Sequence, residues 1–160
     1  MHNELAEAIH LREDGEHEEA RNLLLKLVAE HPEEAIVHFQ TAWVHDAMGL
    51  EREAVAFYER ALELGLSNRE RAPALLGLGS TLRTLGEYAR AIEVLREGVE
   101  DFPEMRAMEV FLIMSLYNEG RHQEAMERAL QIILDTSADD SIGMYERAIQ
   151  FYAGNLDQTW

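Results

Sequence analysis

The sequence predicts an all-α fold, an α-solenoid of about nine helices stacked as antiparallel pairs. Five glycines stand in similar surroundings at spacings of 34, 37, 34 and 34 residues: Gly15, Gly49, Gly86, Gly120 and Gly154. An alanine follows each of the first four glycines five residues later. Each glycine also lies between two stretches whose apolar residues recur every three or four positions, which is the period of a helix. Together these observations indicate a repeated helix–turn–helix unit.

The elements of one unit are clearest around Gly86. Residues 75–85 before this glycine and residues 91–99 after it are both apolar at intervals of three and four. Glycine ends the first helix because it adopts the left-handed backbone conformation that other residues resist. Glu87 opens the second helix, where the helix dipole favours an acidic residue. Pro103 stops that helix, since it lacks an N–H group and has a fixed φ.

The units divide the chain in order along one predicted domain, 1–160. We expect repeats at about 1–34, 35–68, 72–105 and 106–139, a capping helix at 140–153 and a tail at 154–160. Residues 69–71 lie between two repeats. They predict a longer start to the following helix, with Asn68 or Ser67 as its N-cap.

The predicted capping helix tests this scheme, because no second helix follows it. The face toward the absent helix is polar and carries Gly143, Glu146, Arg147 and Gln150. The remaining faces carry Ile142, Met144, Tyr145, Ala148, Ile149, Phe151 and Tyr152. A solvated outer face is what a terminal repeat requires.

A unit of about 34 residues with small residues near its eighth and twentieth positions, a turn glycine and a late proline resembles the tetratricopeptide repeat. In 72–105 the packing positions of that family are held by Leu75, Leu78, Gly79, Leu82, Ala91, Leu95, Gly98 and Pro103. The resemblance covers almost the whole chain. It implies a right-handed superhelix whose concave groove is lined by the first helix of each unit. Since packing defines this family, the resemblance implies function only in general terms.

The resemblance also implies which side chains line the groove. They are Leu5, Ile9, Arg12, Glu13, Ile36, Phe39, Trp43, Asp46, Ala47, Leu76, Ser80, Arg83, Thr84, Ala107, Val110, Met114, Tyr117 and Asn118, with Met144, Ala148, Phe151 and Tyr152 from the cap. A groove with so much apolar and aromatic surface favours partner binding. A second interpretation stays open, in which tight curvature lets these side chains bury against one another.

The expected function is a non-enzymatic scaffold or adaptor that binds a peptide or a helix of another protein. The alternative is a homo-oligomerisation module that uses the C-terminal helix and tail. In that tail, Trp160 either folds back on its own cap or enters the groove of a neighbouring copy. We expect a monomer or a weak homodimer. The sequence does not identify the partner.

No catalytic, metal or cofactor site is predicted. The chain has no cysteine, and no glycine-rich phosphate loop or activated serine appears. His38 and His45 share a helical face, but zinc requires three or four ligands. A packing role for these histidines is the preferred interpretation. Glycines such as Gly77 are interpreted as points of close helix contact.

The charge of the chain limits its partners. Thirty-one acidic and 14 basic side chains give a net charge of −17. This charge disfavours nucleic acid and anionic membranes as partners and favours a basic segment. An ordinary Glu-rich solvated surface would also account for it. The absence of cysteine, a signal-peptide pattern and a long apolar run predicts a cytoplasmic protein.

Overall fold

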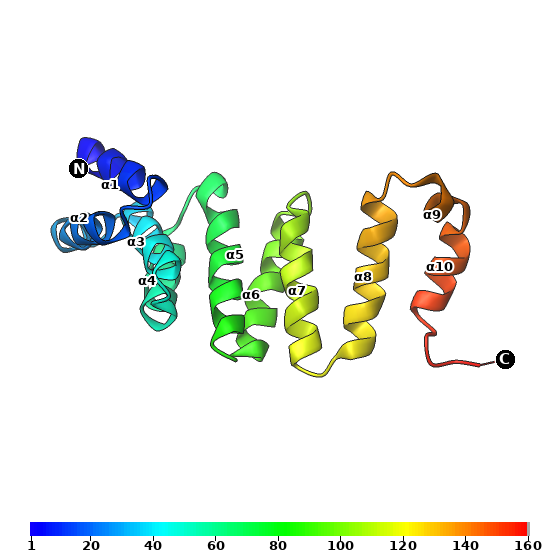
Figure 1. Ribbon diagram of the computed structural model, residues 1–160. Coiled ribbons are helices and arrows are strands. Elements are labelled where there is room, and N and C mark those ends of the chain that lie inside the picture. The colour runs from blue at the N-terminus through cyan, green and yellow to red at the C-terminus, as the bar shows by residue number, and fades with distance from the viewer. Residues whose placement is uncertain (160) are drawn as a thin grey trace. The chain divides into compact units, whose positions relative to one another are not determined.

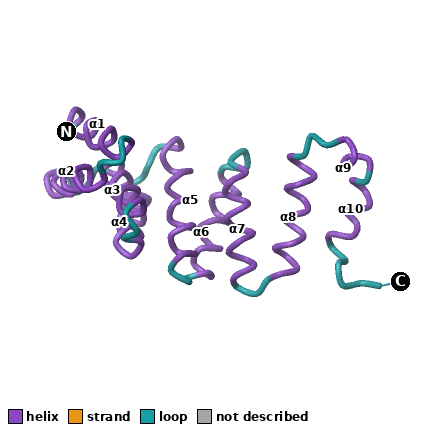
Figure 2. Tube along the Cα trace, in the orientation of Figure 1, coloured by secondary structure: helices purple, strands orange, loops and turns teal. Residues whose placement is uncertain are grey.

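The computed structural model describes residues 1–159, and its regular structure consists of ten helices with no strand in that range (Figures 1 and 2). The helices are α1 (His2–Glu13), α2 (His17–Glu30), α3 (Ala35–Ala47), α4 (Glu51–Leu64), α5 (Asn68–Thr84), α6 (Tyr88–Asp101), α7 (Arg106–Asn118), α8 (His122–Thr136), α9 (Asp140–Met144) and α10 (Glu146–Ala153). The all-α prediction is confirmed. The tenth helix arises because the predicted capping helix is divided in two.

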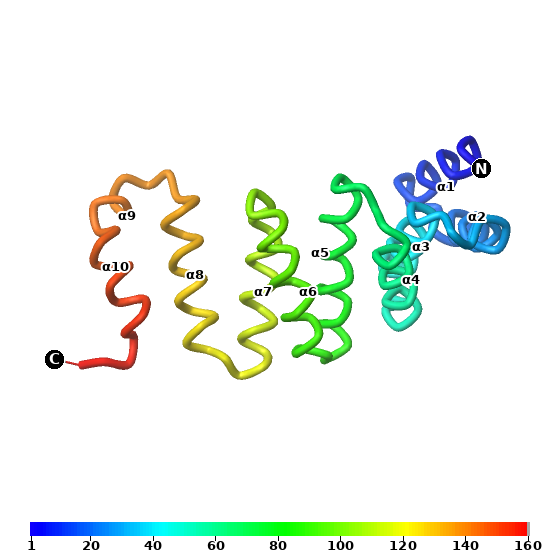
Figure 3. The backbone as a smooth tube through the Cα atoms, turned by 180° about the vertical axis from the view of Figure 1, so that it is seen from behind, coloured from blue at the N-terminus to red at the C-terminus, as the bar shows by residue number. Residues whose placement is uncertain are grey.

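The chain forms two compact units, unit 1 (Met1–Glu87) and unit 2 (Tyr88–Trp160). In unit 1 each helix packs on the next, and α3 also contacts both α1 and α5. In unit 2, α6 packs on α7, and α8 packs on both α7 and α10. Figures 1 and 3 both place α8 between α7 and α10. Consecutive packed helices are the arrangement expected of a helical repeat protein.

Four of the five turn glycines adopt the predicted left-handed conformation, and the fifth does not. Gly86 has a φ of +79°, and the N–H of Glu87 donates to the carbonyl of Leu82 at 2.9 Å, which closes the end of α5. The same left-handed turn recurs at Gly15, Gly49 and Gly120. Gly154 instead has a φ of −84°, and residues 155–159 after it form no helix.

Small residues mark the places where helices approach closely. The alanines five positions after the turn glycines, Ala20, Ala54, Ala91 and Ala125, are all buried. A Cβ atom added to Gly77 of α5 would lie 2.5 Å from the ring of Tyr58 in α4. The predicted contact role of Gly77 is therefore confirmed. The predicted helix start is confirmed too, since α5 begins at Asn68 with Ser67 as its N-cap.

The C-terminal cap differs from its prediction. Asp139 caps α9 by accepting a hydrogen bond from the backbone N–H of Ser141 at 2.8 Å, but that helix ends after one turn. The helical conformation is interrupted at Tyr145, and α10 begins at the next residue. Gly143 explains part of this interruption, because glycine is about 1 kcal/mol less favourable than alanine within a helix. In α10 only Ala153 is buried, so little packing holds the two segments in one helix.

Candidate partner-binding surfaces

Trp43 is the one exposed large apolar side chain among the described residues of unit 1. It lies on α3, and 41% of its surface is exposed. Phe39, one turn earlier on the same helix, is only 3% exposed, and its ring centroid lies 5.5 Å from that of Trp43. Phe39 also contacts Tyr58 of α4. The prediction that Phe39 lines the surface is therefore corrected, because Phe39 supports Trp43 from within the core.

Arg12 also contacts the ring of Trp43. The guanidinium carbon of this α1 residue lies 3.9 Å from the centroid of the Trp43 ring, a cation–π contact. Only 10% of the Arg12 side chain is exposed, and burial lowers its pKa, although arginine keeps its charge in proteins. Its Nε atom is buried without a hydrogen-bond partner in the described chain. Contacts with Phe39 and Arg12 thus restrict the orientation of Trp43 before any partner binds.

A buried polar network joins the three helices behind Trp43. The hydroxyl of Tyr58 donates to Asp46 Oδ2 at 3.0 Å, and the hydroxyl of Thr81 lies 2.7 Å from the same oxygen. Burial raises the pKa of Asp46, while these two hydrogen bonds act in the opposite direction. Burial and the neighbouring Asp46 carboxylate raise the pKa of Tyr58, which therefore keeps its proton and remains a donor. The network connects α3, α4 and α5.

The other unit 1 residues predicted to line the surface are less accessible than Trp43. Leu5, Ile9, Leu76 and Arg83 are all partly buried. Leu5 packs against the core cluster formed by α1, α2 and α3. The accessible apolar surface of unit 1 is therefore concentrated at Trp43.

Unit 2 carries its predicted lining residues on two helical surfaces. Val110, Met114 and Tyr117 are spaced by four and three residues along α7, and Val110 and Tyr117 are exposed. Asn118 ends that helix and is exposed as well. Met144, Phe151 and Tyr152 are all exposed on α9 and α10.

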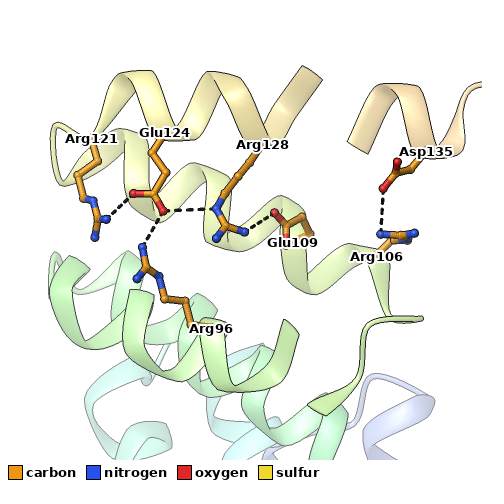
Figure 4. Close-up of polar contacts among 7 residues, drawn as sticks. All are labelled: Arg96, Arg106, Glu109, Arg121, Glu124, Arg128 and Asp135. Carbon is orange, nitrogen blue, oxygen red and sulfur yellow. Dashed lines mark hydrogen bonds and ion pairs between the residues drawn. The ribbon is translucent and has the colours of Figure 1, made fainter. Parts of the chain in front are cut away.

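Ion pairs connect the helices of unit 2 (Figure 4). Glu124 of α8 receives a hydrogen bond from Arg96 of α6 at 2.7 Å and also contacts Arg121 and Arg128. Arg128 reaches Glu109 of α7 at 2.8 Å. These groups are partly exposed, so each pair contributes modestly, roughly 0–1 kcal/mol.

The two central histidines make structural contacts. His38 Nε2 lies 2.8 Å from the carbonyl of Pro32, and His45 Nδ1 lies 2.7 Å from the carbonyl of Thr41. Arg21 Nε donates to His45 Nε2 at 3.3 Å. Across residues 1–159, no group of three or more acidic or histidine side chains is arranged to hold a metal ion.

The stacking of Arg12 on Trp43 was not predicted from the sequence. The predicted groove lining contains both residues but gives no contact between them. The repeat register offered a signal, since it places neighbouring first helices side by side.

Across residues 1–159, no helix is both long and apolar enough to cross a membrane.

Comparison with known families decides the identity of the fold. The family model described as "Tetratrico peptide repeat" matches residues 35–156. The chain belongs to this family. Tetratricopeptide-repeat proteins typically act as non-enzymatic scaffolds that mediate protein–protein interactions, so the scaffold class predicted from sequence is supported.

Solved tetratricopeptide-repeat structures agree in fold. YrrB has a TM-score of 0.75 at 20% identity, with 96% of this chain and 80% of YrrB covered. A MamA protein has a TM-score of 0.74 at 17% identity over 90% of this chain and 74% of MamA. MamA from Desulfovibrio magneticus RS-1 gives 0.67 at 15% identity over 94% and 93%. Identities this low establish the fold alone. A search of curated proteins found no match.

Proposed function

We propose that this chain is an adaptor that holds a peptide or helix of another protein against the first helices of its repeats, with Trp43 as the anchor in unit 1. The supporting observation is an exposed tryptophan that is already fixed in place by Arg12 and Phe39. Binding energy at protein interfaces is concentrated in a few such aromatic anchors. A side chain that is held before binding loses less conformational freedom on binding.

Other lines of support come from the fold and from the exposed side chains of unit 2. The similar structure YrrB is described as having "an unusual peptide-binding site". In unit 2 the proposed binding residues lie on α7, α9 and α10 and, apart from the partly buried Met114, are exposed: Val110, Met114, Tyr117, Asn118, Met144, Phe151 and Tyr152. In unit 1 the proposed surface includes Leu5, Ile9, Leu76 and Arg83 beside Trp43.

The proposed partner is a protein or peptide, and the net charge of −17 argues against nucleic acid and anionic membranes. The proposed chemistry is binding without catalysis, metal or cofactor. We propose a cytoplasmic monomer or weak homodimer.

Replacement of Trp43 tests this function directly. If the anchor supports micromolar binding of about −8 kcal/mol, Trp43→Ala removes roughly 2–4 kcal/mol of it. Wild-type and variant chains are immobilised and their binding proteins recovered from native cells, with crosslinking and quantitative mass spectrometry. Glu53→Ala, an exposed change on α4, is the matched control. Equal recovery of every partner by the wild type and Trp43→Ala would reject Trp43 as the anchor.

Self-assembly is a second candidate, favoured by the exposed apolar residues near the C-terminus. Tyr145, Tyr152 and Leu156 are all exposed. Trp160, for which the sequence leaves open folding back on its own cap or entry into a neighbour's groove, lies outside the described residues. Light scattering of the full chain and of residues 1–154 separates the two functions. A mass that falls on truncation supports assembly through the tail, and an unchanged mass argues against it.

A further inference from the structure

One side of α10 and the turn before it carry large apolar side chains that are mostly exposed. Within α10, Ala148 and Tyr152 are four residues apart, and the ring centroids of Phe151 and Tyr152 lie 5.4 Å apart. Tyr145 directly precedes the helix. The exposed fractions are 64% for Tyr145, 55% for Phe151 and 51% for Tyr152. Met144, next to Tyr145, is 80% exposed. These five residues are called the α10 apolar surface below.

Acidic residues lie close to the α10 apolar surface along the sequence. Residues 129–160 contain five acidic side chains and a single basic one, Arg147. Asp140 opens α9, Glu146 opens α10, and Asp157 follows α10. These three carboxylates are exposed and form no ion pair within the described part of the chain. An apolar surface with acidic neighbours is complementary to a segment that combines apolar and basic side chains.

The backbone of the occupant is constrained by what α10 offers. The N–H and C=O groups along a helix are already bonded within it, so its side has none to give. An extended segment lying on the α10 apolar surface would leave some of its own backbone groups unpaired in an apolar contact, which opposes binding. A helical segment satisfies its backbone internally and packs side chain against side chain. The surface therefore favours a helix.

Charge also separates a foreign helix from a second copy of this chain. A symmetric dimer through α10 would bring together two segments that each carry five acidic residues and one basic residue. Like charges facing one another across an interface oppose association. A basic helix converts the same carboxylates into favourable contacts.

We infer that the α10 apolar surface binds a basic amphipathic helix of a partner protein. This inference rests on the proposed protein-binding function and names the partner chemistry for the C-terminal surface. The two are tested on different units, because Trp43 belongs to unit 1 and the α10 apolar surface to unit 2. Equal recovery of partners by Trp43→Ala and the wild type would reject Trp43 as the anchor and leave this inference intact. Failure of a basic amphipathic helix to bind at α10 would reject this inference and leave Trp43 as the anchor.

The probe is a synthetic, fluorescently labelled peptide of leucine and lysine, about 18 residues long, with leucines at helical spacing. A peptide of the same composition in scrambled order has no apolar face. A third peptide replaces lysine with glutamate. Binding to the full-length chain is followed by fluorescence anisotropy at low and moderate salt. We expect the amphipathic lysine peptide to bind about tenfold more tightly than either control.

Matched double variants locate the binding surface. The double variant Met144→Ser with Tyr152→Ser is expected to bind the lysine peptide about tenfold more weakly than the wild type. Met126→Ser with Ile133→Ser removes two exposed large apolar side chains from α8, outside the proposed binding surface. This second variant is expected to bind like the wild type. Circular dichroism checks that both variants keep the wild-type helix content.

Neutralising variants test the role of local charge. Asp140→Asn, Glu146→Gln and Asp157→Asn together are expected to weaken binding about threefold to tenfold at low salt and to reduce its salt dependence. The control makes an equal change in net charge in unit 1, at three exposed positions: Glu16→Gln, Glu19→Gln and Glu53→Gln. If both triple variants lose the same affinity, net charge alone explains binding and the inference fails.

Three further outcomes would overturn the inference. Equal binding of the scrambled and amphipathic peptides would exclude recognition of a helix face. A concentration-dependent dimer that Met144→Ser with Tyr152→Ser abolishes would assign the surface to a second copy. Binding that tightens about tenfold in a chain ending at Gly154 would assign it to the C-terminal residues of the same chain.

Discussion

Unit 1 and unit 2 differ in how they treat large apolar side chains. In unit 1, Trp43 is the one exposed large hydrophobic residue among those described. In the described part of unit 2 there are nine: Val110, Tyr117, Met126, Ile133, Met144, Tyr145, Phe151, Tyr152 and Leu156. From α8 onward, the buried hydrophobic residues are Ala125 and Ala153 alone in the same range. The same repeat pattern therefore produces a well-packed unit and a unit with sparse packing at its end.

The difference indicates that a terminal repeat has two routes to stability. It can make its outer face polar, or it can leave apolar groups for a partner to cover. Gly143, Glu146, Arg147 and Gln150 follow the first route, and all four are exposed. The α10 apolar surface follows the second.

The largest expected effect compares leucine or isoleucine truncation in the two units. Leu82 in α5 is fully buried, so Leu82→Ala should lower the free energy of unfolding by about 2–5 kcal/mol. Ile133 in α8 is 44% exposed, and Ile133→Ala should cost less than about 1.5 kcal/mol. Urea denaturation followed by circular dichroism measures both. Equal costs would remove the distinction between the units.

Two glycine substitutions give a smaller effect of opposite sign. Gly77→Ala places a Cβ atom 2.5 Å from the Tyr58 ring, and we expect a loss of about 1–3 kcal/mol. Gly143→Ala meets no atom within 4 Å, and it should stabilise the α9 segment by up to about 1 kcal/mol. Thermal unfolding checks the sign of each change. A stabilising Gly77→Ala would contradict the close approach of α5 to α4.

The smallest effect is a pair of opposite pH dependences. Asp46 has a raised pKa, chiefly from burial, so its contribution to stability is present below its unfolded pKa and is lost as pH rises through the folded value. The stability of Asp46→Asn relative to the wild type should therefore increase as pH rises from about 4. Thr81, Tyr58, Glu51 and His45 all act on this carboxylate and stay unchanged in the comparison.

Asp139 in unit 2 should behave in the opposite way. Its hydrogen bonds with Ser141 lower its pKa, so its contribution is present above its unfolded pKa and is lost as pH falls through the folded value. The stability of Asp139→Asn relative to the wild type should decrease as pH rises from about 3 to 5. Denaturation of the three chains, the wild type, Asp46→Asn and Asp139→Asn, across this range measures both slopes. Slopes of the same sign would contradict the contrast between a buried and a capping carboxylate.

Turns and packing positions were predictable from the sequence because they depend on local geometry. A left-handed turn needs glycine, and a close helix contact needs a small residue, so Gly86, Ala91 and Gly77 are visible in the sequence. Depth is not visible in the same way. Phe39 and Trp43 share one helical face, but Tyr58 from α4 packs against Phe39. Burial here depends on a neighbour that the period of a helix does not specify.

The cap escaped prediction for a related reason. Its apolar period is continuous from Ile142 to Tyr152, and periodicity alone predicts one helix. A helix this short depends on tertiary packing more than on propensity. Few buried contacts are present in α9 and α10 to compensate for Gly143.

The pattern of helix contacts has a consequence for how the chain acquires its structure. Each substantial helix–helix contact in residues 1–159 joins helices that are adjacent or separated by one other helix. The chain segments that must be closed to form such contacts are short, and their entropic cost is low. Domains with this topology reach the native state within about microseconds to milliseconds. A nascent chain can therefore complete its N-terminal helices while later ones are still being synthesised.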